Sequence, residues 1–465
     1  MQTEILVIGA GVAGLTAGRV LAEAGRQVMV VEARSRIGGR VLTVDAEGEP
    51  VELGAEFVHG RPPELWALIE EAELRAYELD GEELCRSEDG GRLEPCAREL
   101  EEDFDWIERL KGWGGLNSAG PDTAGQDCSF AEYLEHAQVP EEQRVRLISY
   151  VEGFNAADHH QISAMALGRQ QEAEDAIEAD RLFHVEGGYR QVPEFLAGRL
   201  EAAGGRILLE HAVTAVAWEQ GSARIDCSFL GDSAGGGLMN GGLVSIEAQK
   251  VIVTLPLGVL QAGVVRWSPE PAAILEAAAG MRMGQARRAV LRFRESPVGR
   301  ALAHVSAETA PEGEAEMRRF GFLFAYGKVP PVWWTQYPHR SATLTGWVGG
   351  PRTEAWNGLP ESEVRRDAVA TLAELLGADA DALDAALAGC HTHDWQRDPF
   401  ALGAYSYVAT GAIGASAQMC EPQRQTLFFA GEHTDTTGHW GTVHGAMRSG
   451  LRVAAQVLAA QVLSA

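Results

Sequence analysis

A glycine-rich turn near the start of the chain most constrains its fold. An apolar run leads into Gly9, Gly11 and Gly14, an alanine-rich stretch follows, and a second apolar run over residues 28–31 ends at Glu32. This spacing predicts a strand, a tight turn, a helix and a second strand. The first glycine permits the turn, the second lets the backbone approach a pyrophosphate, and the third lets helix pack on strand. Because the helix N-terminus attracts phosphate and the final carboxylate can bind a ribose diol, we predict a dinucleotide site.

The length and composition of the chain limit what it can be. With 465 residues it is longer than one hydrophobic core normally serves, so we expect two domains. Its formal net charge of −27 leaves no basic surface for nucleic acid, which is therefore not an expected partner. The six cysteines form no C-x-x-C pair, so neither a disulfide framework nor a metal site is expected, and this usage suits the cytoplasm. The apolar stretches are too short or too polar to span a bilayer, and no export signal is expected.

The character of the sequence changes twice along the chain. Residues 62–200 are acidic and favour helices, whereas strand patterns return near residue 206 and continue over 285–350. A last strand pattern at 427–430 precedes a final helix. We therefore predict an α/β fold with two interleaved domains. They are a Rossmann-type nucleotide-binding domain of residues 1–75, 200–285 and 392–465, and an α+β substrate-binding domain of residues 76–199 and 286–391.

Further motifs occur along the chain in a recognisable order. They are Arg34-x-x-x-Gly38-Gly39-Arg40, Gly54-Ala55-Glu56-Phe57, the Leu-Pro-Leu-Gly-Val-Leu run at 255–260, Gly403-Ala404-Tyr405-Ser406-Tyr407, and Phe429-Ala430-Gly431-Glu432-His433-Thr434. Together with the opening turn, these motifs resemble the flavin amine oxidases, the group of monoamine oxidases, polyamine oxidases and lysine-specific histone demethylases. The resemblance is weak over 62–185 and 295–390, where substrate recognition would lie.

The resemblance implies a non-covalently bound FAD and assigns residues to it. Arg40 would neutralise the pyrophosphate, Val213 would meet the adenine through its main chain, and Glu432 would hold ribityl or ribose hydroxyls. From residue type alone, the same three are compatible with an ion pair, a core valine and a helix-cap partner. Ala404 stands where monoamine oxidases carry the cysteine of a thioether bond, so no covalent link is expected. The other residues implied at the cofactor are Gly9, Gly11, Ala13, Gly14, Glu32, Ala33, Arg34, Gly39, Gly54, Ala55, Glu56, Phe57, Trp395, Gly431, Thr442 and Val443.

On the substrate side the resemblance implies an aromatic wall. Tyr405 would orient an amine beside the flavin, and Trp395 would pack near the flavin ring. Thr442 stands where monoamine oxidases place a second tyrosine, which implies a more open pocket. His59 occupies a position where some polyamine oxidases also carry histidine, and it could contact a substrate nitrogen. The alternatives are a core tyrosine, a tryptophan at a domain boundary and an ordinary loop histidine.

Arg288 is the main departure from the family pattern. Many members carry a lysine at this place, linked through water to flavin N5. Arginine stays charged and cannot serve as a base. Three roles remain open for Arg288: a donor to a water near N5, a partner of a substrate carboxylate, or a structural ion-pair residue.

The resemblance predicts the reaction. We expect oxidation of the C–N bond of a primary, secondary or polyamine by hydride transfer to flavin N5, hydrolysis of the imine, and reoxidation by O2 to give H2O2. Replacement of the lysine leaves an amine dehydrogenase with another acceptor open. An L-amino-acid oxidase would need a carboxylate anchor, for which Arg288 or Arg61 is available. A flavin-bound binding protein without oxidase activity is the third alternative, and the oligomeric state, monomer or homodimer, stays open.

Overall fold

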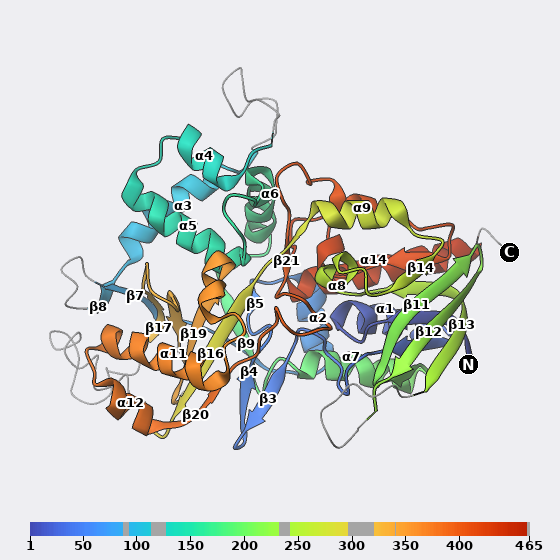
Figure 1. The fold of residues 1–465 in the computed structure, drawn as a ribbon, viewed down its shortest axis with the longest axis horizontal. Helices are drawn as coiled ribbons and strands as arrows, with labels where there is room; N and C mark the ends of the chain where they lie inside the picture. The colour runs from blue at the N-terminus through green and yellow to red at the C-terminus, as the bar shows by residue number, and fades with distance from the viewer. Residues whose placement is uncertain (87–92, 113–126, 232–241, 296–319, 340, 463–465) are drawn as a thin grey trace.

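The computed structural model describes the chain except for residues 87–92, 113–126, 232–241, 296–319, 340 and 463–465. Two sheets, each with its own helices, lie at opposite ends of an elongated molecule (Figure 1). The N-terminus and the end of the last helix both lie beside the first sheet. The α/β class and the Rossmann-type unit predicted from the sequence are confirmed, whereas the residue boundaries of the two domains stay a prediction.

The first sheet has a parallel core. Its strand order is β10 (Arg206–Leu208), β2 (Val28–Val31), β1 (Gln2–Ile8) and β13 (Leu243–Val253), and β22 (Leu427–Phe429) also pairs with β13. The strands β12 (Ser222–Phe229) and β11 (His211–Glu219) continue it antiparallel, and β14 (Arg266–Ser268) pairs with β11 in parallel. All four residues of β2 are buried, as expected for a parallel strand covered on both faces.

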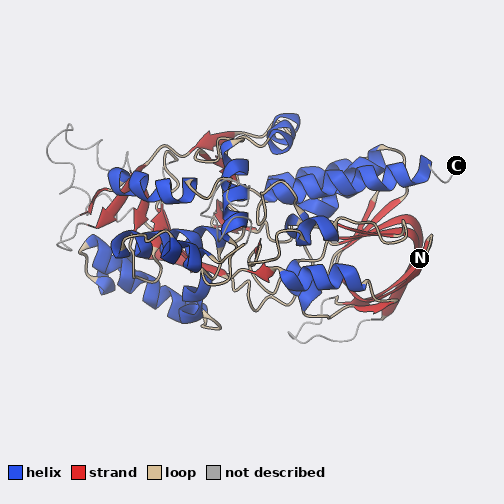
Figure 2. Ribbon diagram, turned by 90° about the horizontal axis from the view of Figure 1, so that it is seen from above, coloured by secondary structure: helices blue, strands red, loops and turns tan. Residues whose placement is uncertain are grey.

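Helices cover both faces of this sheet, which is why its strands read as continuous apolar runs. One core packs against α1 (Val12–Glu23), α7 (Gln191–Ala202) and α14 (Val443–Val462), and α1 contacts both of the other helices. The other core includes α8 (Leu257–Gln261), α9 (Ala272–Gly280) and α13 (Ala415–Met419). Alternate residues of β1 enter the two cores: Ile5 and Val7 the first, Leu6 and Ile8 the second. Figure 2 shows the long α14 running past the strands.

The second sheet is mixed and has its own core. Its strand order is β20 (Leu387–His391), β16 (Ala286–Phe293), β19 (Thr343–Gly349), β18 (Val332–Trp334), β17 (Phe320–Phe324), β7 (Glu82–Arg86) and β8 (Leu93–Pro95). The helices α11 (Glu361–Leu376) and α12 (Ala380–Ala386) pack on it, next to the 3-10 turn η1 (Gly350–Trp356). All eight residues of β16 are buried, so Arg288 on this strand is removed from bulk water.

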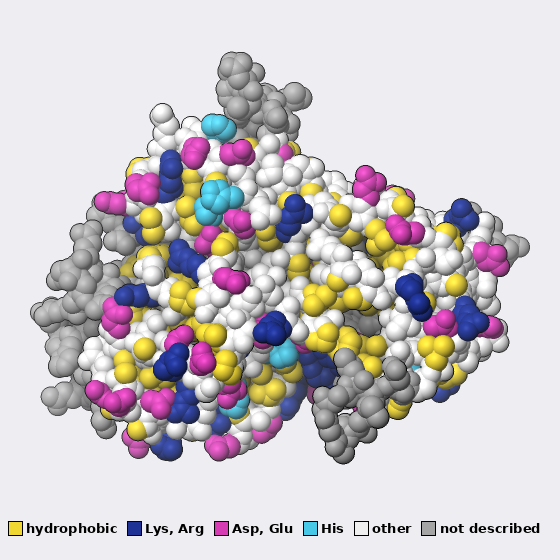
Figure 3. All heavy atoms as spheres, in the orientation of Figure 1, with side chains coloured by type: hydrophobic (Ala, Val, Ile, Leu, Met, Phe, Trp, Pro, Cys, Tyr) yellow, Lys and Arg dark blue, Asp and Glu magenta, His cyan; other side chains and the backbone are white. Residues whose placement is uncertain are grey.

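Smaller elements join the two sheets. A helical layer of α3 (Ala97–Glu108), α4 (Phe130–His136), α5 (Glu141–Asn155) and α6 (Ala164–Asp175) has a separate core. The remaining elements are α2 (Pro63–Glu71), the hairpin β3 (Thr43–Ala46) and β4 (Glu49–Glu52), the sheet of β5 (Val58–His59), β9 (Leu182–Val185) and β6 (Ala76–Glu78), the pair β15 (Arg282–Met283) and β21 (Ser406–Tyr407), and η2 (Glu432–Thr434). None of the described helices is long and apolar enough to cross a membrane. On the face drawn in Figure 3, acidic and basic side chains are interspersed.

The turn between β1 and α1 depends on its glycines. Gly9 has a φ of +107°, a conformation that residues with a side chain rarely adopt. A Cβ on Gly14 would lie 2.1 Å from the Gly9 carbonyl oxygen, so helix and turn approach too closely for any side chain. A Cβ on Gly11 would meet nothing within 4 Å, because this glycine faces open space.

Replacement of Gly14 by alanine tests whether this close contact stabilises the turn. We expect Gly14→Ala to lower the free energy of unfolding by about 1–3 kcal/mol, since a methyl group against backbone forces helix α1 away from the strand. Gly198→Ala on α7 is the matched control, because a Cβ there meets nothing within 4 Å. Alanine at this exposed helical position should stabilise the protein by roughly 0.5–1 kcal/mol. Chemical denaturation of the apoprotein measures both, and equal effects would contradict the packing argument.

Candidate functional site

One cavity of about 540 Å³ extends between the two sheets. It runs from the turn after β1 to the aromatic residues of the second sheet, and such a volume is in the usual range of small-molecule sites. Of the site residues predicted from the sequence, Gly14 does not line this cavity, because it lies under the turn. The others line it: Gly9, Gly11, Ala13, Glu32, Ala33, Arg34, Gly39, Arg40, Gly54, Ala55, Glu56, Phe57, His59, Val213, Arg288, Trp395, Tyr405, Gly431, Glu432, Thr442 and Val443.

The cavity end nearest β1 has the chemistry that a dinucleotide requires. Gly11 is open to the cavity at the start of α1, so backbone N–H groups at a helix N-terminus are accessible to phosphate. Glu32 directly follows β2, and its carboxylate accepts hydrogen bonds from the backbone N–H groups of Ala10 (2.8 Å) and Arg34 (3.0 Å). These bonds hold the carboxylate still at the cavity wall. The residues present therefore fit the expected FAD.

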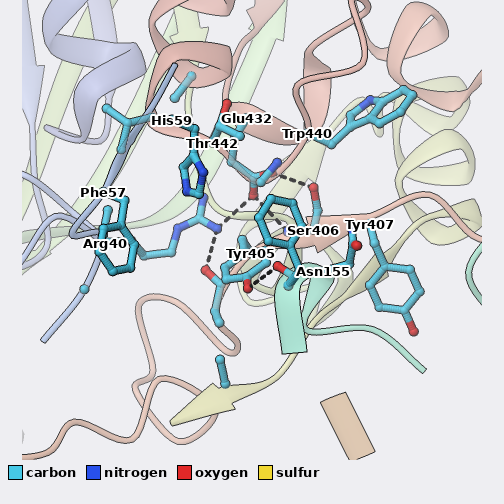
Figure 4. Close-up of a pocket in the computed structure, with 18 of the residues that line it drawn as sticks. Arg40, Phe57, His59, Asn155, Tyr405, Ser406, Tyr407, Glu432, Trp440 and Thr442 are labelled. Atoms are coloured by element: carbon cyan, nitrogen blue, oxygen red, sulfur yellow. Dashed lines mark hydrogen bonds and ion pairs between the residues drawn. The ribbon is translucent and has the colours of Figure 1, made fainter. Parts of the chain in front are cut away.

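Glu432 lies at the centre of a buried network (Figure 4). Its Oε1 accepts a hydrogen bond from Arg40 Nη1 at 2.8 Å, and its Oε2 accepts from Ser406 Oγ at 2.6 Å and from the Gly441 N–H at 2.8 Å. Burial alone would raise the pKa of Glu432, but Arg40, His433 and the Ser406 hydroxyl together outweigh burial and hold that pKa below its usual value. Arg40 Nη1 also donates to the Ala404 carbonyl at 2.9 Å. Sequence reasoning treated Arg40 and Glu432 as separate cofactor contacts and missed their ion pair, and their cofactor roles stay a prediction.

Thr442 caps the last helix. Its hydroxyl donates to the His439 carbonyl at 2.8 Å and accepts from the Gly445 N–H at 2.9 Å, in the manner of an N-cap residue. The preceding Gly441 has a φ of +74°, and a Cβ there would lie 2.9 Å from Tyr405 Cδ2. The start of α14 and the tyrosine ring therefore touch, and only glycine fits between them.

Two aromatic residues at the cavity are fixed by hydrogen bonds to backbone. The Tyr405 hydroxyl donates to the Phe154 carbonyl at 2.7 Å, and burial raises the pKa of this phenol, so it stays protonated. The Trp395 indole N–H donates to the Leu53 carbonyl at 2.8 Å. Both rings are held in place without a charged partner, which suits an aromatic wall.

His59 contributes a neutral imidazole to the cavity. Its ring lies between Phe57 and Phe154, with centroid distances of 6.1 and 5.5 Å, and its Nδ1 has no hydrogen-bond partner among the described residues. Burial lowers the pKa of His59 to about 4. His444, on the first turn of α14, also lines the cavity, and its Nε2 has no partner in the described structure. Both rings therefore offer neutral nitrogens at neutral pH.

Arg288 forms a buried ion pair. Its Nη1 lies 2.5 Å from Glu56 Oε2 and donates to the Glu52 carbonyl at 3.1 Å. Of the three roles left open by the sequence, the structural ion pair is the one that this geometry displays. Arg61, the other candidate anchor for a carboxylate, does not line the cavity and lies over the Trp66 ring at 4.6 Å. Neither arginine is thus available as an unpaired anchor.

A polar track on α5 and α6 escaped sequence reasoning. Asn155 Nδ2 donates to Gln170 Oε1 at 2.6 Å, and Gln170 Nε2 donates to Glu174 Oε1 at 2.7 Å. All three residues line the cavity, and Asn155 Oδ1 is buried without a hydrogen-bond partner in the described part of the chain. Burial raises the pKa of Glu174 to about 7, and no cationic side chain among the described residues opposes this shift. The four-residue spacing of Gln170 and Glu174 was the available signal, since it places both on one helix face.

Replacement of Glu432 by glutamine tests the network around it. We expect Glu432→Gln to weaken FAD binding at least about tenfold, because it leaves the partly buried Arg40 charge without its partner. The matched control is Glu64→Gln, which breaks the 2.5 Å contact of Glu64 with Arg448 outside the cavity. Titration of the apoproteins with FAD, followed by flavin fluorescence, should show unchanged affinity in the control. Equal losses in both variants would contradict a specific role of Glu432.

Comparisons with known proteins agree with this site. The family model described as flavin containing amine oxidoreductase matches residues 12–458. Polyamine oxidase 1 of Oryza sativa subsp. japonica is 28% identical over 98% of this chain and 97% of its own length. The lysine-specific histone demethylase 1 homolog 3 of Arabidopsis thaliana is 27% identical over 98% of this chain, which spans only 30% of that protein. A putrescine oxidase solved with putrescine bound has a TM-score of 0.79 at 22% identity and covers 99% of both chains, which shows a shared fold. The chain belongs to the flavin-containing amine oxidoreductases and is an FAD-dependent enzyme that oxidises amines.

Proposed function

We propose that the substrate is a diamine or polyamine and that O2 is the electron acceptor. The observation that carries the substrate class is Glu174, a cavity carboxylate whose charge is balanced by no cationic side chain of the described residues. A second ammonium group on the substrate would supply that balance. A polyamine oxidase and a putrescine oxidase are among the similar proteins, which supports this substrate class. Both are oxidases, which supports O2 as the acceptor. The six cysteines of the described structure are free thiols, which supports a cytoplasmic location.

The reacting end of the substrate would lie beside Tyr405. Asn155 directly follows Phe154, whose carbonyl holds the Tyr405 hydroxyl, so the unpartnered Asn155 Oδ1 lies close to this ring. Such an oxygen accepts a hydrogen bond from an amine N–H, and the ring orients the amine by its face. His59 stays neutral and adds a further acceptor. A substrate amine is thus positioned by neutral groups, which favours the uncharged form that must react.

The wall residues that the structure holds rigidly would position the cofactor. Glu32 and the open turn at Gly11 would bind the ribose and pyrophosphate, and the start of α14 at Thr442 and Val443 would face the flavin. When bound, FAD supplies the acceptor for the hydride of the amine α-carbon. Enclosure of both partners in a largely apolar cavity provides proximity and excludes water.

A panel of amines tests the substrate class. Holoenzyme in air is given diamines, monoamines of equal chain length and L-amino acids, and peroxide and carbonyl product are measured. We expect the highest kcat/KM with diamines or polyamines, weak turnover of monoamines and none of amino acids, since Arg288 and Arg61 are both engaged. Product from amino acids alone would overturn the proposal.

A variant of Glu174 tests the proposed distal contact. Glu174→Gln should raise KM for a diamine at least about tenfold, while KM for the matched monoamine changes less than about twofold. The control is Glu172→Gln on the same helix, because Glu172 is exposed and does not line the cavity. A parallel rise with both amines would show that Glu174 acts on the fold and not on the second ammonium.

The raised pKa of Glu174 predicts a pH dependence. Below about pH 7 the group is largely neutral, and above it the carboxylate forms, so KM for a diamine should fall as pH rises from 6 to 8. Glu174→Gln should remove this dependence of KM on pH, because the amide does not titrate. Stopped-flow measurement of substrate affinity from pH 6 to 8 checks the sign. If KM of the variant still fell with rising pH, the titrating group would be another residue.

A further inference from the structure

The ion pair of Arg288 and Glu56 is buried in the cavity wall. The two side chains are 6% and 4% exposed, and the guanidinium carbon lies 5.1 Å from the Trp347 ring centre and 5.6 Å from that of Trp334. The Trp334 indole N–H donates to Glu56 Oε1 at 3.0 Å. Arg288 also lines the cavity that would hold the substrate. The wall therefore contains a permanent cation whose charge is cancelled from behind.

A second set of contacts keeps Glu56 in place. His184 Nε2 lies 3.3 Å from Glu56 Oε1, outside hydrogen-bonding alignment, and the Tyr77 hydroxyl lies 3.0 Å from His184 Nδ1. The Phe57 ring stacks on His184 at 5.1 Å. Burial is the largest single influence and would raise the pKa of Glu56, but Arg288, His184 and Trp334 together outweigh it, so the pKa lies below its usual value. The carboxylate thus stays ionised opposite the guanidinium.

The sign of the uncancelled charge decides what this wall attracts. A guanidinium without Glu56 would repel an ammonium group and would bind a carboxylate through its paired N–H donors. Repulsion and attraction are both strong here, because the tryptophans exclude water and little screening remains. With Glu56 in place, neither effect operates.

We propose that Glu56 is a specificity-determining residue: by cancelling the charge of Arg288, it admits cationic amines and denies an anchor to substrates that carry a carboxylate. The inference rests on the proposed function in one respect, namely that the substrate binds in this cavity. It adds that selection against amino acids depends on a carboxylate that need not touch the substrate.

Glu56→Gln in the holoenzyme is the direct test, with benzoate as the probe. Benzoate is an anion without an amine, and its binding is followed by perturbation of the flavin spectrum, which requires no turnover. We expect the variant to bind benzoate at least about tenfold more tightly than the wild type, and its KM for the amine to rise at least about tenfold. The double variant Glu56→Gln/Arg288→Met should lose the gain in benzoate affinity.

Glu52→Gln is the matched control. The Glu52 carboxylate is half-buried nearby but accepts hydrogen bonds from Thr43 Oγ (2.7 Å) and the Tyr189 N–H (2.7 Å), and it forms no ion pair with the guanidinium. Its replacement should leave benzoate affinity within about twofold of the wild type. An equal gain in both variants would overturn the inference, because any lost negative charge would then suffice. Unchanged benzoate affinity in Glu56→Gln, with FAD retained, would overturn it as well.

Arg288→Met decides the matter if Glu56→Gln does not retain FAD. It leaves the Glu56 carboxylate facing the cavity uncancelled, so benzoate should bind no better than to the wild type, and KM for the amine should not rise. Tighter benzoate binding in Arg288→Met would contradict the inference. Failure of the proposed function is recognised separately, since the wild-type enzyme would then yield no carbonyl product from any amine.

Discussion

The arrangement around the cavity depends on the ion pair between Arg40 and Glu432. The Glu432 carboxylate contacts three segments. It pairs with Arg40 in the segment after the first nucleotide-binding unit, and it accepts hydrogen bonds from Ser406 of β21 and from the Gly441 N–H at the start of α14. A buried carboxylate is costly unless all its lone pairs are used, and here protein donors use both oxygens. This requirement brings three distant parts of the chain together, and it sets the position of Tyr405, whose ring contacts Gly441.

Charges at the cavity fall into two groups. Arg40 and Arg288 each pair with a buried glutamate, and Arg34 pairs with Asp398 at 2.7 Å. Within the part of the chain that the structure describes, Glu174, by contrast, has no cationic partner that affects its pKa. Since paired charges cancel, the other carboxylates of the cavity lining, which are Glu174, Glu83 and Asp180, determine the sign of the charge that the substrate region attracts. An enzyme that binds cationic amines gains selectivity from this imbalance of charge.

The local motifs could be predicted from the sequence, and the long-range pairs could not. The spacing of Gly9, Gly11 and Gly14 specifies a strand-turn-helix unit because each glycine meets a steric or phosphate-binding demand within a few residues. The partnership of Glu56 with Arg288 joins residues 232 positions apart, and no local pattern records it. The resemblance placed both at the site but could not choose among the roles of Arg288.

The substrate side was the least predictable part. Asn155 and Glu174 lie in the acidic helical region where the family motifs are weak. From the sequence, a glutamate there is expected on the solvent-exposed face of a helix. Only the packing of α5 and α6 shows that this glutamate is half-buried and lines the cavity. A helical periodicity alone does not tell which partner a face will meet, because that depends on tertiary contacts.

Anaerobic reduction of the bound flavin by an amine tests the central claim most directly. Purified holoenzyme is mixed with a diamine in the absence of O2, and the flavin absorbance is followed with substrate that carries hydrogen or deuterium at the α-carbon. The account predicts bleaching by the diamine, slower with deuterium, because the C–H bond at that carbon breaks as the flavin is reduced. A yellow holoenzyme that no amine bleaches would contradict the account.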